Sequence, residues 1–255
     1  MTRVRAAFRL ARTALHVLGG ALTVALVFPV CRNENRQRLK RRWSAHLVTI
    51  LGVELRCSGV ASASGLIVAN HISFLDIYVI NAIMPASFVS KDEVRKWPLI
   101  GWFAANTNTI FMARGSRSAA QRTRETCAEH LRQGKCVALF PEGTTSAGDT
   151  VLPFHSALLQ AAIDTGADMI PLAIRYTDAK GNRSYATAYV GDMSLMQCLW
   201  NIACSPRIFV YVDILPAVTT EGIDRRHLSS HAHHMIAHRV SHPLMQGDTS
   251  RQQAQ

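Results

Sequence analysis

Residues 66–80, LIVANHISFLDIYVI, decide the expected fold. The first four residues are apolar and have the length and composition of a buried strand. Polar residues follow at Asn70 and His71, and a second apolar segment with helical spacing begins near Asp76. A buried strand that gives way to polar residues and then to a helix is typical of α/β proteins, which place reactive groups at strand ends. The stretch therefore predicts a sheet with His71 at the end of one strand.

The same strand pattern recurs along the chain and predicts one α/β domain. Short apolar or β-branched segments, separated by longer stretches, lie at 86–89, 109–113, 136–140, 169–174, 186–190 and 207–215. This alternation predicts a mostly parallel or mixed sheet flanked by helices. Neither an internal repeat nor a Pro/Gly/Ser-rich linker divides the sequence. We expect membrane-anchoring helices over residues 1–52, one domain over 53–243 and a polar tail over 244–255.

A membrane-associating segment precedes the predicted domain. Residues 14–31, ALHVLGGALTVALVFPVC, are almost entirely apolar, and arginines flank them on both sides. A helix of this length rises about 27 Å, slightly less than the thickness of a hydrocarbon core. Basic residues on both flanks do not orient a spanning helix, but they suit a segment that dips into one anionic leaflet. We expect a one-leaflet anchor at the inner membrane, with the domain facing the cytoplasm. A cleaved signal peptide is the alternative, but no small-residue cleavage site follows Pro29.

Residues 34–52, ENRQRLKRRWSAHLVTILG, predict an amphipathic helix. Arginines occupy one face. The other face carries Leu39, Trp43, Leu47 and Ile50. Such a helix should lie on the core of the domain or on the bilayer.

The charge of the chain favours anionic partners. Its 28 Lys and Arg residues exceed its 17 Asp and Glu residues, which gives a formal charge of +11. Nucleic acid, acidic lipid headgroups and an acidic carrier protein all suit this charge. The sequence lacks interleaved aromatics, a helix-turn-helix pattern and zinc-finger spacing, so we expect an anionic membrane surface and no nucleic acid. The six cysteines show no paired spacing, and we expect isolated thiols in a reducing compartment.

His71 and Asp76 can form an acid–base pair. A histidine that titrates near neutrality can accept a proton from a hydroxyl group, and a carboxylate on its other ring nitrogen fixes the tautomer. Five residues along one continuous helix would place the two side chains on different faces. The pair therefore requires a turn at residues 72–73, with Asp76 in the first turn of the helix. A capping histidine beside an N-terminal acid is the alternative interpretation.

A second strand ends in a polar loop at residues 136–149, CVALFPEGTTSAGD. The loop offers backbone N–H groups and hydroxyls that could bind an anion or the hydroxyls of a ligand. Its candidate binding residues are Glu142, Gly143, Thr144 and Thr145. Taken alone, the loop is more simply interpreted as a solvated turn.

A third strand, within residues 108–125, is followed directly by Arg114. An arginine at a strand end can bind a phosphate through two parallel hydrogen bonds. Neighbouring arginines also fit the exposed face of a helix, which is the simpler interpretation of a charged segment. We single out Arg114 because it alone lies at the strand end.

A stripe of histidines lies near the C-terminus, within residues 223–244. Its members follow one another at helical spacing: His227, His231, His234, His238 and His242. Such a stripe could bind a metal ion, but no Cys, Asp or Glu joins it. We expect neither a metal ion nor a cofactor in this protein.

The order of four segments resembles that of the glycerolipid acyltransferase family, which includes the 1-acylglycerol-3-phosphate acyltransferases. NHISFLD matches the H-x4-D block of the family, TIFMAR its second block, FPEGTTS its third and MIPLAI its fourth. The resemblance covers roughly residues 53–216. It implies a lysolipid acceptor and an acyl-CoA or acyl carrier protein donor. The acyl chain would move to the free hydroxyl of 1-acyl-sn-glycerol-3-phosphate and give phosphatidic acid.

The resemblance also implies roles for single residues. His71 would be the general base and Asp76 its orienting partner. Arg114, Glu142 and Gly143 match positions associated with binding of the acceptor headgroup. Pro171 matches the block linked to the acyl donor.

The sequence departs from the family pattern at Thr145, where phosphate-acceptor enzymes usually carry an arginine. Acyltransferases of lyso-ornithine lipid, whose acceptor has no phosphate, also resemble this chain, including residues 90–102, SKDEVRKWPLIGW. Lyso-ornithine lipid is therefore the alternative acceptor. Two noncatalytic alternatives are a basic nucleic-acid-binding protein and a membrane adaptor that keeps only the fold.

Overall fold

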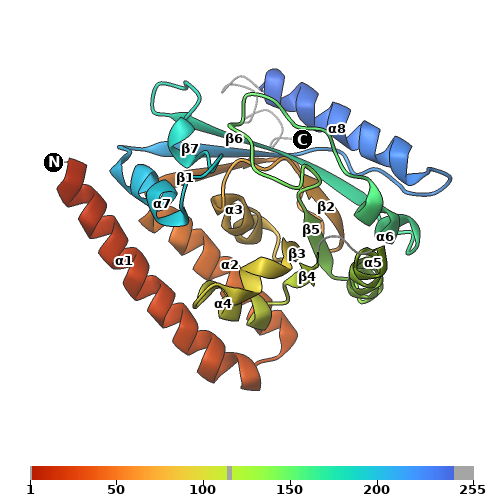
Figure 1. The fold of residues 1–255 in the computed structure, drawn as a ribbon, viewed down its shortest axis with the longest axis horizontal. Helices are drawn as coiled ribbons and strands as arrows, with labels where there is room; N and C mark the ends of the chain where they lie inside the picture. Colours follow the sequence, from red (N-terminus) through yellow and green to blue (C-terminus); the bar gives the residue numbers. More distant parts are fainter. Residues whose placement is uncertain (1, 114–116, 244–255) are drawn as a thin grey trace.

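A mixed seven-stranded sheet runs through the residues that the computed structural model describes, 2–113 and 117–243 (Figure 1). Its strand order is β1-β7-β6-β2-β5-β3-β4. The strands are β1 (Val53–Ser58), β2 (Gly65–Ala69), β3 (Ala86–Lys91), β4 (Ile110–Met112), β5 (Cys136–Leu139), β6 (Met169–Asp178) and β7 (Ile208–Ile214). Strands β6 and β7 pair antiparallel, whereas β2 pairs parallel with both β5 and β6. The predicted α/β fold with a mixed sheet is confirmed.

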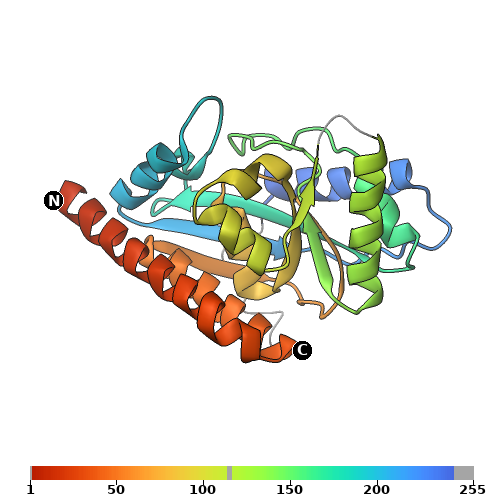
Figure 2. The ribbon, with the colours of Figure 1, turned by 60° about the horizontal axis from the view of Figure 1, so that its bottom comes forward.

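Helices cover both faces of this sheet (Figures 1 and 2). They are α1 (Thr2–Leu22), α2 (Asn33–Ile50), α3 (Leu75–Ile83), α4 (Ile100–Asn106), α5 (Arg117–Arg132), α6 (Gln160–Ile163), α7 (Leu195–Cys204) and α8 (Arg225–Ser241). Buried residues of α2, α3 and α7 form one apolar core with the sheet, and buried residues of α5, α6 and α8 form the other. The sheet is therefore the middle of three layers.

Strand β2 is central because both of its faces and both of its edges are covered. All five of its residues are buried, as expected for a short apolar strand between two parallel neighbours. The side chain of Asn70, just past the strand, then bonds to β6 twice: its Nδ2 donates to the Ile174 carbonyl at 3.0 Å, and its Oδ1 accepts from the Ile174 N–H at 2.8 Å. These bonds fix the chain where it leaves the sheet for His71.

The predicted strand at 186–190 is wrong. Its first residues lie in a 3-10 turn, Tyr185–Thr187, and the rest follow an irregular path. The backbone N–H of Tyr189 donates to the carbonyl of Ile72 at 3.0 Å, so this segment bonds to the loop beside His71 and not to a strand. Conversely, β1 was not among the predicted strands. Its residues alternate between apolar and polar, which is the pattern of a strand with one covered face.

Helix α1 is held against the domain by arginines near its N-terminus. The Arg5 guanidinium donates to the carbonyl of Cys204 at 2.6 Å, and that of Arg9 donates to the carbonyls of Ser205 at 2.6 Å and Pro206 at 3.1 Å. These carbonyls lie at the C-terminal end of α7. Carbonyl groups at a helix end lack intrahelical partners and carry partial negative charge, so cationic donors suit them.

A close contact between α1 and α2 fixes the middle of α1. The rings of His16 and Trp43 stack with centroids 4.8 Å apart, and Nε2 of His16 and Nε1 of Trp43 each bond to the backbone carbonyl of the other residue. The Trp43 ring also lies over Gly20, where a Cβ would come within 2.4 Å of its Nε1. The contact therefore requires glycine at position 20.

The outer face of α1 and of the turns that continue it to Val30 is apolar. Large apolar side chains on this face include Val4, Phe8, Leu15, Leu18, Leu22 and Leu26, each with between 54% and 75% of its surface accessible. The inward face carries the small residues Ala6, Thr13 and Gly20. A helix on the surface of a water-soluble protein instead turns its apolar face towards the core and its polar face towards solvent. The helical segment Thr2–Val30 is also long and apolar enough to cross a membrane.

We expect Arg9→Met to loosen α1 without unfolding the sheet. The substitution removes the guanidinium that donates to the carbonyls at the end of α7. Each hydrogen bond from a charged donor contributes about 1.5–3 kcal/mol to stability. Hydrogen exchange should accelerate over residues 2–22 and remain unchanged over β2 and β6. Arg12→Met is the matched control, because Arg12 is exposed on the same helix. Equal exchange in both variants would contradict the docking role of Arg9.

Candidate active site

The turn between β2 and α3 carries the predicted acid–base pair. His71 Nδ1 lies 2.9 Å from Asp76 Oδ2, and Asp76 occupies the first turn of α3. The same oxygen accepts the backbone N–H groups of Ile72 at 2.7 Å and Ser73 at 2.9 Å. These bonds form the turn at residues 72–73 that the sequence requires, so the structure brings the two side chains together.

Exposure differs sharply between the two members of the pair. The His71 side chain is 18% accessible, whereas that of Asp76 is 0% accessible. A proton on Nδ1, donated to the carboxylate, leaves Nε2 as the hydrogen-bond acceptor of the ring. The imidazole can therefore meet a substrate through one nitrogen while the buried carboxylate holds the other.

Tyr176 completes the surroundings of Asp76. Its hydroxyl donates to Asp76 Oδ1 at 2.7 Å, across 100 positions of sequence. Burial, together with the adjacent carboxylate, raises the pKa of Tyr176 well above its usual value, so the phenol keeps its proton and remains a donor. Nothing in the motif spacing pointed to Tyr176, which lies two positions beyond the MIPLAI segment in β6.

Phe140 fixes the plane of the imidazole. Its ring stacks on His71 with centroids 3.9 Å apart and planes inclined by 8°. Phe88 of β3 lies behind it at a centroid distance of 5.9 Å. Because Phe140 directly precedes the predicted loop of residues 141–149, its position beside a strand end was the available signal for a residue of the site.

Glu142 supports the His71 turn from the other side. Its Oε1 accepts the backbone N–H of His71 at 2.6 Å, and its Oε2 accepts that of Leu152 at 2.8 Å. The residue is buried, and burial raises the pKa of Glu142 above its ordinary value while the two backbone bonds oppose the shift. Both carboxylate oxygens thus bond to the backbone. Contact of Glu142 with an acceptor headgroup stays a prediction.

The rest of this loop wraps over the His71 turn. Gly143 has φ +68, a conformation that favours glycine, and Thr144 is exposed. The Thr145 hydroxyl donates to the carbonyl of Tyr189. The backbone N–H of Ser146 donates to the carbonyl of His71 at 2.8 Å. The structure therefore places this predicted binding loop next to the general-base candidate.

The two remaining predicted residues differ in position. Pro171 lies buried within β6, paired with Val68 of β2, and its carbonyl accepts the N–H of Leu215 at 3.0 Å. Its place inside the sheet gives it a structural role beside the strand that leads to His71. Arg114 lies outside the described residues. A substrate contact by either residue stays a prediction.

Two buried thiols of the core are poor nucleophiles. All six cysteines are free. Burial raises the pKa of both Cys136 and Cys198 to about 11, so each remains a neutral thiol at physiological pH. Neither thiol is therefore an activated nucleophile, and a catalytic role for His71 stays a prediction.

Four members of the histidine stripe lie on α8, and His242 directly follows its last residue. The ring centroids of His238 and His242 are 4.6 Å apart, and those of His234 and His238 are 6.4 Å apart. Within residues 2–113 and 117–243, no group of three or more His, Cys, Asp or Glu side chains is arranged to hold a metal ion.

Comparison with known proteins, by sequence and by structure, finds similarity to acyltransferases. A family model described as acyltransferase matches residues 53–175. A lyso-ornithine lipid O-acyltransferase from Pseudomonas aeruginosa is 36% identical over 79% of this chain and 78% of its own. A 1-acyl-sn-glycerol-3-phosphate acyltransferase from Neisseria gonorrhoeae is 39% identical over 63% of each chain. The crystal structure of a 1-acyl-sn-glycerophosphate acyltransferase from Thermotoga maritima has the same fold, with a TM-score of 0.69 and 22% identity over 94% of this chain and 97% of the other.

The raised pKa of Glu142 predicts a pH dependence of stability. The folded state binds a proton more tightly than the unfolded state, whose glutamate titrates near 4.5, so the free energy of unfolding falls as pH rises from 4.5 through the folded pKa. Glu142→Gln removes this contribution. We expect the wild-type protein to lose stability relative to the variant over that interval, as measured by urea unfolding at a series of pH values. A difference between the two proteins that does not change with pH would contradict the prediction.

Proposed function

This chain belongs to the acyltransferase family, and we propose that it moves a fatty acyl chain from a thioester to the free hydroxyl of 1-acyl-sn-glycerol-3-phosphate, giving phosphatidic acid. The observation that carries the proposal is the partly exposed His71 imidazole, held at 2.9 Å by the fully buried carboxylate of Asp76. This arrangement supplies a base with a fixed tautomer. Acyl transfer between a hydroxyl and a thioester needs such a base.

The proposed reaction is a direct transfer. Nε2 of His71 accepts the proton of the acceptor hydroxyl while that oxygen attacks the thioester carbonyl. The imidazolium that forms is stabilised by the Asp76 carboxylate, which Tyr176 and two backbone N–H groups hold in place. As the tetrahedral intermediate collapses, the carbon–sulfur bond breaks, and the imidazolium returns the proton to the departing thiolate. The protein leaves the cycle in its starting protonation state.

A second candidate acceptor is lyso-ornithine lipid, which Thr145 favours. Phosphate-acceptor enzymes usually carry an arginine at this position, whereas the Thr145 hydroxyl is engaged with the carbonyl of Tyr189 and adds no positive charge. The similarity to the Pseudomonas aeruginosa protein, which spans most of both chains, also supports this acceptor. The donor in either reaction would be acyl-CoA or acyl carrier protein, and the net charge of +11 suits both acidic donors and an anionic bilayer.

The N-terminal helix supports a one-leaflet attachment at the cytoplasmic face of the inner membrane. Helix α1 is held by Arg5 and Arg9 near one end and by His16 and Gly20 farther along, so the helix lies beside the domain (Figure 2). Its apolar stripe faces outward, and the neighbouring helix α7 adds the exposed side chains Met196 and Trp200. A helix docked along its length can place this stripe in a lipid surface while the domain remains in water.

Substitutions in the acid–base pair should have graded effects on turnover. His71→Ala removes the base, and we expect a loss of at least about 1000-fold in kcat, within the range known for general-base catalysis. Tyr176→Phe keeps the base but removes one donor to Asp76, and we expect about a tenfold lower kcat with an unchanged KM. Steady-state acyl transfer in membranes tests both. Near wild-type turnover by His71→Ala would show that the general-base assignment is wrong.

The choice of acceptor can be tested at Thr145. Thr145→Arg adds a charged donor, and we expect the ratio of transfer to lysophosphatidate over transfer to lyso-ornithine lipid to rise about tenfold, equivalent to 1.4 kcal/mol. Thr145→Gln, which is long but uncharged, is the control. Both acceptors should be offered separately with labelled acyl-CoA and acyl carrier protein. An equal ratio in all three proteins would exclude Thr145 as a determinant of the acceptor.

A further inference from the structure

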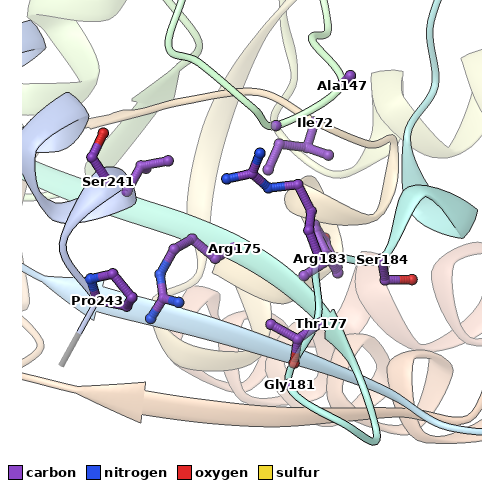
Figure 3. A pocket seen from close by; sticks show the side chains of 12 residues that line it. Ile72, Ala147, Arg175, Thr177, Gly181, Arg183, Ser184, Ser241 and Pro243 are labelled. Atoms are coloured by element: carbon purple, nitrogen blue, oxygen red, sulfur yellow. The ribbon is translucent and has the colours of Figure 1, made fainter. Parts of the chain in front are cut away.

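A pocket lies beside the His71 turn, and Figure 3 shows residues that line it. Its volume is about 190 Å³. Tyr176 points from β6 towards Asp76, and because side chains alternate along a strand, its neighbours Arg175 and Thr177 point to the opposite face. Ile72 and Gly148 close the pocket from the two loops that surround His71. The pocket is therefore adjacent to the proposed reaction centre and separate from it.

Arg175 brings a positive charge that the protein only partly neutralises. Its Nη2 lies 3.7 Å from Asp213 Oδ2, and Arg239 approaches the same oxygen at 4.0 Å. Two guanidinium groups thus share one carboxylate. The Arg175 side chain is 15% accessible, its guanidinium lies over the ring of Tyr211, and its Nε has no hydrogen-bond partner within residues 2–113 and 117–243.

Thr177 adds a buried hydroxyl to the same pocket. The residue is 8% accessible, and in the described part of the chain its Oγ1 has no hydrogen-bond partner. A buried hydroxyl without a partner destabilises a protein, and most buried polar groups are paired. Two unpaired polar atoms, the Oγ1 of Thr177 and the Nε of Arg175, therefore belong to residues that line one cavity.

Arg183 provides a second guanidinium. It extends across the pocket towards Ile72 and Ala147 (Figure 3), and its Nη1 donates to Asp149 at 2.6 Å. Among the described residues that line the pocket, the charged side chains are those of Arg175 and Arg183, and both are cationic. They bring hydrogen-bond donors from two different segments, β6 and the chain that follows it.

We propose that this pocket binds a phosphate group, either free or as part of a phosphate ester. A tetrahedral anion accepts hydrogen bonds in several directions at once, which suits donors on Arg175, Thr177 and Arg183 better than a planar carboxylate would. Arginine recognises phosphate through its planar array of N–H groups. The apolar side chains of Ile72 and Val240 leave one wall for a short organic portion of an ester. The proposed phosphate site takes no part in the acyl transfer proposed above. Binding of a phosphate group is the only property that we assign to it.

Phosphate binding can be measured as a rise in unfolding temperature of the full-length protein in neutral detergent, with ionic strength held constant by chloride. We expect a saturable rise with inorganic phosphate for the wild-type protein. Arg175→Gln should weaken the apparent affinity at least tenfold. Thr177→Val should also weaken it several-fold, yet raise the unfolding temperature without phosphate because it removes an unpaired hydroxyl. This opposite pair of effects separates ligand binding from a general loss of structure.

Arg207→Gln is the matched control, because Arg207 is exposed, pairs with Glu54 of β1, does not line the pocket, and carries the same charge. It should retain the wild-type response to phosphate. A wild-type response no larger than in chloride alone, or an equal response in Arg175→Gln, Thr177→Val and Arg207→Gln, would overturn the proposal.

The chemical source of the phosphate is distinguished by three ligands tested in the same way. Tighter binding of glycerol 3-phosphate than of inorganic phosphate would assign the site to a lipid headgroup, and tighter binding of 4′-phosphopantetheine would assign it to the acyl donor. Tightest binding of inorganic phosphate would assign it to the free anion. His71→Ala should bind all three as the wild type does, so a failure of the proposed acyl transfer would remain distinguishable from a failure of this site.

Discussion

The structure around the site depends on the burial of one carboxylate. Asp76 has no accessible side-chain surface, and a buried charge is tolerated when hydrogen bonds replace the lost water. Its two oxygens accept from two backbone N–H groups and a tyrosine hydroxyl and face the imidazole of His71. These requirements set the path of the chain between β2 and α3. The position of the imidazole follows from that path.

A second buried carboxylate makes the arrangement rigid from the opposite side. Glu142 holds the N–H of His71, while Ser146, four residues later, donates to the His71 carbonyl. The backbone of one residue is thus held at both of its polar groups by one loop. Since the ring is also stacked on Phe140, neither the backbone nor the side chain of His71 is free to adapt to substrate. The site is organised before any ligand arrives, which favours catalysis by fixed groups.

Much of this arrangement was predictable from local sequence. The apolar segment before Asn70 predicted a strand, and the five-residue spacing of His71 and Asp76 predicted a turn, because a continuous helix would have separated them. Local patterns failed where a distant segment decides the structure. Residues 186–190 have the composition of a strand, but Tyr189 bonds to the turn beside His71. Tyr176 was missed for the same reason, since only the folded sheet brings its hydroxyl to Asp76.

The attachment of α1 also has a consequence for biosynthesis. Arg5 and Arg9 bind carbonyl groups 199 and 196 positions later in the chain. A ribosome that adds about 5–20 residues per second makes those carbonyl groups roughly 10–40 s after the arginines. During that delay the carbonyl partners of these two arginines do not yet exist. It follows that α1 can pair with α2 through His16 and Trp43, only 27 positions apart, long before its N-terminal arginines are docked.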